Sequence, residues 1–321
     1  MGRIRVAVIG AGGIAGAHLR AYSTQAERCQ IVGVADVDEG AAKARAAEYG
    51  GQAFADGVTM LEQLQPDAVS ICTPPKFRIP FVEAAAARGI AVLCEKPPAR
   101  TLAETQAIVD AMRGQLLQFA FCHRFHPPLN AAQDLIRSGK LGELVQIENR
   151  FAFRFARAGK SWFTDAHIAG GGILIDTLVH SIDIFRALTG QEIDAAQACL
   201  SSTLPIEVED SASLLVRSSG GVLGTLNCSW VTPVSDSFVR IHGSEGGAVI
   251  DYNAAAGLRY KLADDAEWTE MQSDAPDRFT QQAAHFLDCV EGKASPLVSG
   301  EDGLAVMRVI EAAYESAGVR T

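Results

Sequence analysis

Positive charge is scarce in this chain relative to negative charge. Its 28 lysines and arginines are outnumbered by 38 aspartates and glutamates, which leaves a formal net charge of −10 and an isoelectric point near 5.2. Proteins that bind nucleic acids or anionic membranes through charge gather basic side chains into patches. We therefore expect neither a nucleic acid nor a membrane as a partner, and we expect the acidic surface to serve solubility.

Long apolar runs and paired cysteines are missing as well. The alanine-rich runs are interrupted within a few residues, and none approaches the roughly 20 apolar residues that span a bilayer. The first residues enter a strand pattern without the features of an export signal. The 7 cysteines cannot all pair, and no Cys-x-x-Cys motif occurs among them. We expect reduced thiols and a cytoplasmic protein.

The length of 321 residues suggests two domains, because a typical domain holds about 100 to 200 residues. In residues 1–121, apolar strand patterns alternate with helical ones. These strand patterns are continuously apolar, which is typical of strands buried on both faces of a parallel sheet. This part is therefore predicted to be a doubly wound α/β domain of the Rossmann type, which binds dinucleotides. The expected strands cover residues 3–10, 30–36, 68–73, 90–96 and 116–121.

Residues 122–321 follow a different rhythm. A long β-prone run and a glycine-led helix come first, and several β-prone runs then follow one another with short connections. Short connections indicate antiparallel pairing, so we predict a mixed α+β domain. Helices are expected at residues 128–138, 172–188, 277–290 and 302–316, and strands at residues 143–155, 193–204, 212–218, 222–231, 238–241, 248–252 and 258–262.

A glycine-rich turn between the first strand and the first helix indicates the class of cofactor. Gly10, Gly12 and Ala15 fit the pattern Gly-x-Gly-x-x-Gly/Ala. The glycines allow a tight turn and a close approach to a pyrophosphate, and the small third residue allows the helix to pack on the strand. The amides of Gly13 and Ile14 at the helix start can bind the phosphates. The turn therefore predicts a bound dinucleotide.

Asp36 indicates which dinucleotide is bound. It ends the second strand pattern, 24 residues beyond Gly12. In Rossmann domains the acid that binds the adenosine ribose lies ~20 residues after the glycine turn. A carboxylate at this position repels the 2′-phosphate of NADP, so we expect NAD rather than NADP.

Four side chains fit proton chemistry on an alcohol. Asp176, His180 and Asp183 are spaced i, i+4, i+7, and a helical turn takes about 3.6 residues, so they share one side of a helix. Alcohol oxidation removes a hydroxyl proton while a hydride leaves, and an imidazole with a pKa near 6.5 suits the proton acceptor. His180 is the predicted base, and Asp176 can bind substrate hydroxyls or favour the charged imidazole. Lys96 can hold the reacting oxygen and stabilise alkoxide charge.

These residues also have plainer interpretations. The helix could present a solvated polar face, and Lys96 could be a surface lysine, although ligands bind at the carboxyl ends of parallel strands in open α/β sheets. Asp183 is expected to be structural, and Glu95 is expected to support the strand end or the cofactor. We expect no metal, because no clear metal-ligand spacing accompanies these residues.

Four sequence blocks resemble the Gfo/Idh/MocA family of oxidoreductases, and they occur in the family's order over nearly the whole chain. The resemblance implies a Rossmann domain followed by an α/β domain built on a large open sheet, with substrate in the cleft between them. It also implies catalytic roles for Lys96, Asp176 and His180, cofactor contacts at Thr73 and Pro74, and a frequently cis peptide before Pro97. The blocks are the glycine turn, Thr73-Pro74-Pro75, Glu95-Lys96-Pro97 and residues 170–183.

Further substrate contacts are expected where the chain enters the second domain. His123 and Arg124 are predicted to contact the substrate, whereas Trp162 could equally line the pocket or pack. The family commonly has asparagine where His123 stands and histidine where Arg78 stands. Arg78 could pair with a substrate carboxylate or a cofactor phosphate. These departures concern the identity of the substrate and not the class of reaction.

The predicted function is hydride transfer between NAD and a secondary alcohol of a sugar, inositol or related polyhydroxy compound. One alternative is an NAD-dependent glycosidase that oxidises its sugar transiently so that elimination breaks the glycosidic bond, as related family members do. The other is a non-catalytic NAD-binding regulator, which should lack part of the proton-handling set. A broad sheet with one exposed face is commonly covered by another subunit, so we expect a homo-oligomer, either a dimer or a tetramer.

Overall fold

The computed structural model describes residues 2–155, 161–254 and 257–319, which form two compact units. The first unit comprises the residues up to Cys122 together with Pro276–Leu304. The second comprises His123–Ala275 together with the residues from Ala305 onward. The division expected from the sequence, 1–121 and 122–321, had left residues 276–304 with the second domain.

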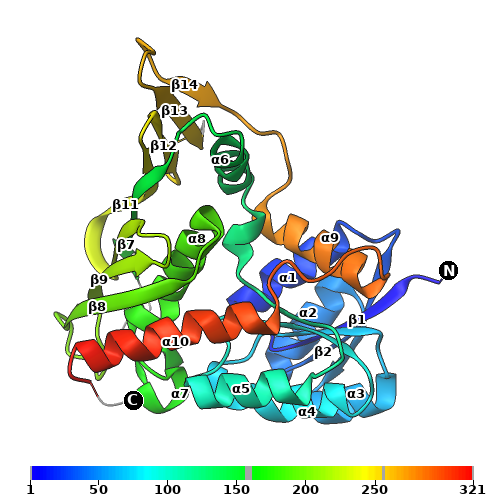
Figure 1. The fold of residues 1–321 in the computed structure, drawn as a ribbon. Coiled ribbons are helices and arrows are strands. Elements are labelled where there is room, and N and C mark those ends of the chain that lie inside the picture. The colour runs from blue at the N-terminus through cyan, green and yellow to red at the C-terminus, as the bar shows by residue number, and fades with distance from the viewer. Residues whose placement is uncertain (1, 156–160, 255–256, 320–321) are drawn as a thin grey trace. The chain divides into compact units, whose positions relative to one another are not determined.

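The first unit is built on a sheet of six parallel strands in the order β3-β2-β1-β4-β5-β6 (Figure 1). This is the Rossmann order, and it confirms the predicted doubly wound sheet. The short and largely exposed β3 was not predicted. The strands are β1 (Ile4–Ile9), β2 (Cys29–Ala35), β3 (Gln52–Phe54), β4 (Ala68–Ile71), β5 (Ala91–Cys94) and β6 (Leu117–Phe119). The helices are α1 (Gly13–Ser23), α2 (Glu39–Tyr49), α3 (Gly57–Leu64), the short η1 (Pro75–Phe77), α4 (Arg78–Ala86), α5 (Leu102–Ala111) and α9 (Arg278–Val290).

Apolar packing explains why α9 belongs to the first unit. Its residues Ala283, Phe286 and Leu287 are at most 3% exposed and join the core cluster that also holds β1 and α1. Burying a large apolar side chain stabilises a fold by roughly 1.5–3 kcal/mol. The sequence predicted the helix, but it could not say which core the helix enters.

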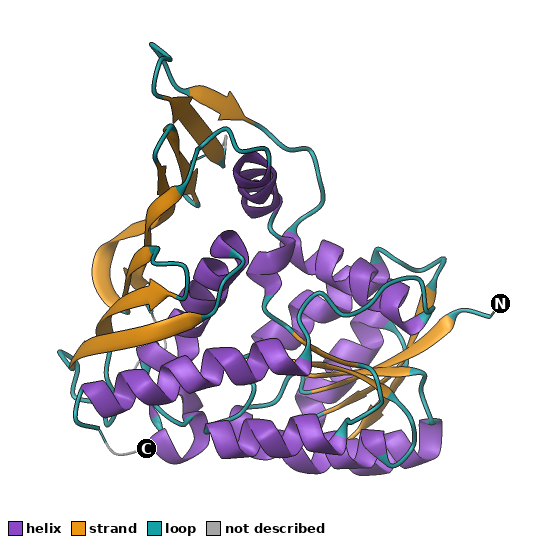
Figure 2. Ribbon diagram, viewed as in Figure 1, coloured by secondary structure: helices purple, strands orange, loops and turns teal. Residues whose placement is uncertain are grey.

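The second unit is built on a sheet of eight strands in the order β14-β13-β12-β11-β7-β10-β9-β8. Figure 2 draws the strands of the chain in orange and its helices in purple. Neighbouring strands are antiparallel except β7 and β10, which confirms the predicted, mostly antiparallel sheet. The strands are β7 (Leu144–Arg154), β8 (Ile193–Ser201), β9 (Ser211–Ser218), β10 (Leu223–Ser229), β11 (Val231–Gly243), β12 (Gly246–Asp251), β13 (Leu258–Leu262) and β14 (Thr269–Met271). The helices are α6 (Pro127–Arg137), η3 (Trp162–Thr164), α7 (Ala166–Ala169), η4 (Leu174–Leu178) and α8 (Val179–Thr189). Two further helices, η2 (Cys122–Phe125) and α10 (Gly300–Ser316), begin in the first unit and end in the second.

The sheet of the second unit has one covered face and one open face. Burial alternates along β9 and β10, as it does in a sheet packed on one side only. Helix α8 packs against β7 and β10. The helical run Ala166–Thr189 is long and apolar enough to cross a membrane by length and composition alone, but 78% of its apolar window is buried, as in a core helix. This buried run carries the candidate catalytic residues of the second unit.

Candidate active site

The glycine turn has the geometry that a dinucleotide requires. Gly10 has φ +101°, a conformation that favours glycine, and a Cβ there would lie 3.0 Å from the backbone of Cys72. A Cβ at Gly12 or Gly13 would meet no atom within 4 Å. Helix α1 starts at Gly13, and no side chain in the described part of the chain caps its first amides. The turn and helix start therefore fit a pyrophosphate.

Asp36 lies at the end of β2 and is held by backbone amides of its surroundings. Its Oδ2 accepts a hydrogen bond from Ala11 N at 2.7 Å, and its Oδ1 accepts one from Asp38 N at 2.9 Å. Both bonds fix the carboxylate next to the glycine turn. The neighbouring Val37 is 93% exposed, which offers an apolar surface beside the position expected for the ribose. Sequence reasoning did not single out Val37.

Thr73 and Pro74 follow β4 at the carboxyl edge of the same sheet. The Thr73 hydroxyl is buried and has no hydrogen-bond partner among the residues that the structure describes. Buried hydroxyls are normally satisfied, so this one fits a polar group supplied by a ligand. The dinucleotide expected from the turn would supply such a group. The residues of the first unit thus fit NAD or NADP.

Lys96 follows β5 at the same edge of the sheet, and the peptide between Lys96 and Pro97 is cis, as the resemblance implied. The backbone N–H of Lys96 donates to the Glu95 carboxylate at 3.0 Å. Arg78, which was expected to meet a substrate or cofactor anion, is instead 2% exposed and donates to backbone carbonyls around Lys96. The side chains of Glu95 and Arg78 therefore both bond to the backbone of Lys96.

Glu95 is held in turn by a buried histidine that sequence reasoning missed. His18 Nε2 lies 2.9 Å from Glu95 Oε1, and both side chains are at most 5% exposed. Burial disfavours the imidazolium, but Cys72 and the Glu95 carboxylate outweigh it and raise the pKa of His18 to about 10. Burial would raise the pKa of Glu95, but the hydrogen bond and charge of His18 lower it instead. His18 and Glu95 thus form a buried ion pair, and Glu95 in turn contacts the backbone of Lys96.

In the second unit, Asp176 and His180 lie on a helical run that begins with a π turn. Residues Leu174–Leu178 form the π turn and α8 continues from Val179, whereas the sequence predicted one regular helix. Such π turns are frequent at functional sites. Asp176 and His180 are half-buried, whereas Asp183 is 0% exposed.

The Asp176 carboxylate is oriented by a short chain of hydrogen bonds. Thr177 Oγ1 donates to Asp176 Oδ2 at 3.1 Å. The buried indole of Trp230 donates to the same Thr177 oxygen at 3.2 Å. No local pattern predicts these hydrogen bonds, because Trp230 lies 53 residues beyond Thr177.

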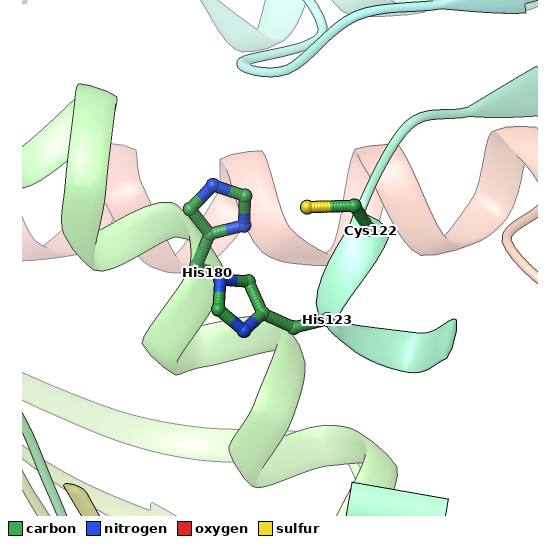
Figure 3. A group of neighbouring side chains, drawn as sticks. All are labelled: Cys122, His123 and His180. Atoms are coloured by element: carbon green, nitrogen blue, oxygen red, sulfur yellow. The ribbon is translucent and has the colours of Figure 1, made fainter. Parts of the chain in front are cut away.

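His123 and His180 lie together. Their ring centroids are 4.7 Å apart with an interplanar angle of 64°, and Figure 3 shows the two rings beside each other. His123 Nδ1 lies 2.9 Å from the Tyr252 hydroxyl, which restrains the His123 ring. The structure thus brings together His123 and His180, two of the predicted site residues of the second unit, and it places Asp176 on the same helical run as His180.

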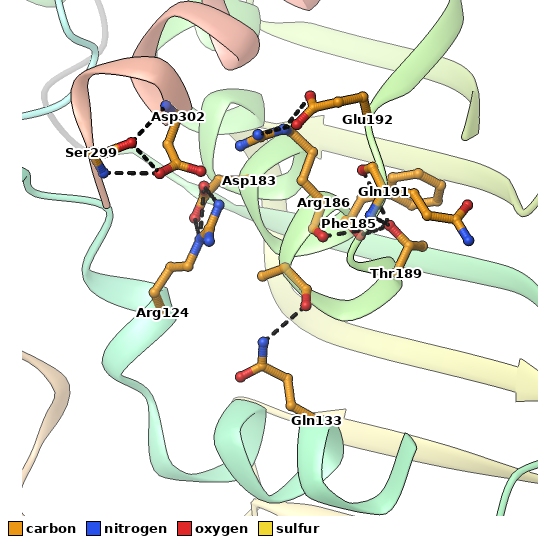
Figure 4. A network of polar contacts seen from close by, with 11 residues as sticks. Arg124, Gln133, Asp183, Phe185, Arg186, Thr189, Gln191, Glu192, Ser299 and Asp302 are labelled. Carbon is orange, nitrogen blue, oxygen red and sulfur yellow. Dashed lines mark hydrogen bonds and ion pairs between the residues drawn. The ribbon is translucent and has the colours of Figure 1, made fainter. Parts of the chain in front are cut away.

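Arg124 is engaged by Asp183. Its Nε lies 3.0 Å from both carboxylate oxygens of Asp183, and its Nη2 lies 2.7 Å from Oδ1 (Figure 4). A bidentate pair between side chains of 13% and 1% exposure is strong and specific. The expected structural role of Asp183 agrees with this contact. A substrate contact by Arg124 stays a prediction.

Trp162 lies in a row of aromatic rings. It stacks on Phe163 at 3.8 Å between centroids, and Phe163 in turn packs edge-on against Phe155 at 5.2 Å. Phe155 also packs against Trp230 at 5.3 Å. Packing therefore accounts for one face of Trp162, and its role as a pocket residue stays a prediction.

A single carboxylate holds the start of the helical run that carries Asp176 and His180. Glu209 Oε1 accepts hydrogen bonds from Gly172 N and Leu174 N, each at 3.0 Å, and from the Tyr314 hydroxyl at 2.8 Å. Burial outweighs these bonds and raises the pKa of Glu209. Sequence reasoning missed Glu209, because neither its spacing nor its residue type marks it.

Comparison with known proteins defines the class of enzyme. Residues 4–122 match the oxidoreductase family with an NAD-binding Rossmann fold, and residues 129–249 match the GFO/IDH/MocA C-terminal domain. With relatives that are named dehydrogenases, these matches make the chain an NAD(P)-dependent dehydrogenase that acts on CH–OH groups. The chain belongs to the Gfo/Idh/MocA family, as the four blocks predicted.

Three of the similar proteins act on sugars or sugar derivatives by their names. D-xylose 1-dehydrogenase (NADP(+)) 2 of Haloferax volcanii is 31% identical over 304 residues, which cover 92% of each chain. D-glucoside 3-dehydrogenase of Escherichia coli is 28% identical and covers 99% of this chain and 96% of its own. Levoglucosan dehydrogenase, solved with NADH and levoglucosan, shares the fold with a TM-score of 0.91 at 23% identity over 99% of this chain and 98% of that chain. Oxidoreduction of a sugar or polyol with NAD(P) is the activity that these relatives support.

Proposed function

We propose that this enzyme transfers a hydride between NAD and a secondary alcohol of a sugar, inositol or related polyhydroxy compound. The observation that carries the proposal is the environment of His180. It lies on the same helical run as Asp176, whose carboxylate is oriented by Thr177, and beside His123, whose ring is restrained by Tyr252. A half-buried imidazole with fixed neighbours suits a general base.

The proton steps follow from the chemistry of these groups. His180 accepts the hydroxyl proton of the substrate as the C–H bond of the same carbon breaks. Lys96 holds the reacting oxygen and stabilises the negative charge that develops on it. Asp176 binds a substrate hydroxyl or stabilises the imidazolium that forms. In the reverse direction, the same groups return the proton to a carbonyl oxygen.

NAD supplies the hydride acceptor when bound. The glycine turn, the amides of Gly13 and Ile14, and the Thr73–Pro74 segment would hold it, with Glu95 and Lys96 at the same edge of the sheet. The fixed carboxylate of Asp36 supports NAD over NADP, because a 2′-phosphate would meet its negative charge at the ribose position. The NADP specificity in the name of the Haloferax relative makes this choice a property to measure.

Polyhydroxy substrates match the polar groups around His180. We propose His123 and Trp162 as further substrate contacts, with Arg124 supporting this region through Asp183. We also propose a homo-oligomer, because the open face of the second unit's sheet carries apolar side chains such as Leu215 at 58% and Leu223 at 54% exposure. Apolar residues on an open sheet face favour association with a second copy.

The test is a panel of aldoses, glycosides and inositols assayed with NAD and with NADP by the absorbance of the reduced nicotinamide. At least one free sugar, glycoside or inositol should give net NADH, with a higher kcat/KM for NAD than for NADP. Cleavage of a glycoside without net NADH would favour the glycosidase alternative instead. Dinucleotide binding without turnover of any compound would favour the regulator.

A further inference from the structure

Arg78 is a charged residue of the first unit that is almost completely buried. It is the first residue of α4, and with 2% exposure it is among the largest fully enclosed side chains of the chain. A guanidinium keeps its charge at every physiological pH. Taking such a charge out of water costs several kcal/mol unless the surroundings compensate it. The atoms that compensate the charge of Arg78 therefore indicate the role of this residue.

Those atoms are backbone carbonyl oxygens of two segments. Nε donates to Thr73 O at 3.0 Å, after strand β4. Nη2 donates to Lys96 O at 3.1 Å, and Nη1 donates to the carbonyls of Glu95 and Pro97. The carbonyl of Pro98 lies 3.5 Å from Nη1. Four successive carbonyls, from residue 95 to residue 98, thus face one cation.

This arrangement fixes the backbone on both sides of the Lys96 side chain. The carbonyl of Lys96 is held by Arg78, and its N–H is held by the Glu95 carboxylate at 3.0 Å. Glu95 is itself held by His18 at 2.9 Å. With both neighbouring peptide groups restrained, the direction in which the Lys96 side chain leaves the backbone is restrained as well.

We propose that Arg78 is a positioning residue that aims Lys96 at the reacting oxygen, and the proposal rests on the proposed function of Lys96. Only arginine offers five N–H donors in one plane, which can reach carbonyls in several directions at once. A lysine would place a single point charge in the same space, and a histidine would offer two ring nitrogens.

The proposal differs from a purely structural role in what a mutation should change. If Arg78 acts through Lys96, its loss should lower turnover while the fold and the affinity for NAD persist. A misplacement of about 1 Å in a catalytic group can cost roughly 100-fold in rate. If Arg78 only stabilises the first unit, its loss should lower the melting temperature and leave the turnover of the folded fraction unchanged.

The experiment compares Arg78→Ala and Arg78→Lys with the control Arg88→Ala. Arg88 follows the same helix, is partly exposed and pairs with Glu62 at 2.6 Å, so its loss removes an arginine without touching residues 95–98. The substrate and cofactor are those found by the panel above. We expect turnover to fall roughly 30- to 100-fold in both Arg78 variants, with NAD affinity within about threefold of the wild type. Added guanidinium chloride at millimolar concentration should restore part of the activity of Arg78→Ala and none of Arg78→Lys.

A double variant separates this inference from the proposed function. The variant Lys96→Ala/Arg78→Ala should be no slower than Lys96→Ala alone, because Arg78 has nothing left to aim. If Lys96→Ala keeps its turnover, the proposed role of Lys96 fails first. If Lys96→Ala loses turnover and the folded Arg78 variants keep it, or if the two losses multiply, the positioning role of Arg78 is overturned. If Arg78→Ala does not fold, Arg78→Lys and its double variant with Lys96→Ala decide the question.

Discussion

In each unit, a segment that carries proposed catalytic residues is held by one charged side chain, and the two charges are opposite in sign. In the first unit, the Arg78 guanidinium donates hydrogen bonds to backbone carbonyl oxygens just after strand β5. In the second unit, the Glu209 carboxylate accepts hydrogen bonds from backbone N–H groups at the start of the helical run of Asp176. The leading N–H groups of a helix have no partners within the helix, and carbonyls beyond a strand end have none within the sheet. A charge of the complementary sign satisfies each set.

The two charges differ in how they respond to pH. Arginine does not titrate in proteins, so the contacts of Arg78 persist over the whole working range. Burial raises the pKa of Glu209, so its charge depends on pH. The first unit also contains a titrating pair, His18 and Glu95, one contact further from Lys96. The backbone around Lys96 is therefore held by the permanent charge of Arg78 and by the buried His18–Glu95 pair. The start of the helical run of Asp176 and His180 is instead held by the titratable Glu209.

The largest effect is expected when each unit loses its own proton-handling group. Lys96→Ala in the first unit and His180→Ala in the second should each lower turnover by at least ~100-fold, the usual scale for an acid or base group. NAD affinity should change little, since the glycine turn and Asp36 are untouched. Steady-state kinetics and NAD titration measure both quantities, with Arg88→Ala as the control. Near-normal turnover in both variants would remove the basis of the proposed mechanism.

The next effect concerns the pH dependence of stability in the first unit. The pKa of His18 is raised to about 10 from its ordinary value of 6.5. The folded state therefore binds the proton more tightly than the unfolded state, so this stabilisation is complete below 6.5 and is lost as pH rises toward 10. Its size is on the order of a few kcal/mol in the free energy of unfolding.

The His18 prediction is checked by chemical denaturation of the wild type and of His18→Gln between pH 6 and 10. The wild type should lose stability steadily across this range. His18→Gln should be less stable at the acid end and should show a flatter profile. Equal slopes for the two proteins would contradict the assigned pKa of His18.

The smallest effect is expected from Glu209 in the second unit. Glu209→Ala removes the acceptor of two backbone N–H groups and of the Tyr314 hydroxyl, and leaving such donors unsatisfied costs roughly 1–3 kcal/mol in the free energy of unfolding. Glu209→Gln keeps an acceptor oxygen and should cost less. Because the folded pKa is raised, the wild type should lose stability relative to Glu209→Gln as pH rises from 4.5 through the raised pKa. A constant difference between these two proteins over pH 4.5 to 8 would contradict the raised pKa.

Local patterns predicted the parts of this enzyme that depend on neighbours in sequence. The continuously apolar strands indicated the parallel sheet, and the glycine turn predicted a site whose geometry fits a dinucleotide. The spacing of Asp176 and His180 placed them on one helical run, although the π turn before α8 was not predicted, because it changes the hydrogen bonds and not the residue types.

Contacts between distant residues were out of reach of the sequence. His18 meets Glu95 across 77 residues, and nothing in either local pattern pairs them. Arg78 was interpreted as an anion-binding residue because arginines usually meet anions, yet its partners are backbone carbonyls, which every residue possesses. The membership of α9 in the first unit was equally hidden, since an apolar helix face does not specify the core that it enters.

Because residues 276–304 belong to the first unit, they are needed in any fragment designed to isolate this dinucleotide-binding unit. A fragment that stops at Cys122 would lack Phe286 and Leu287, so the apolar surface of α1 and β1 that they cover would face water. Such a fragment should aggregate or fold poorly. Joining Cys122 to Pro276 through a short flexible linker and ending the fragment at Leu304 would remove the second unit and leave that surface covered.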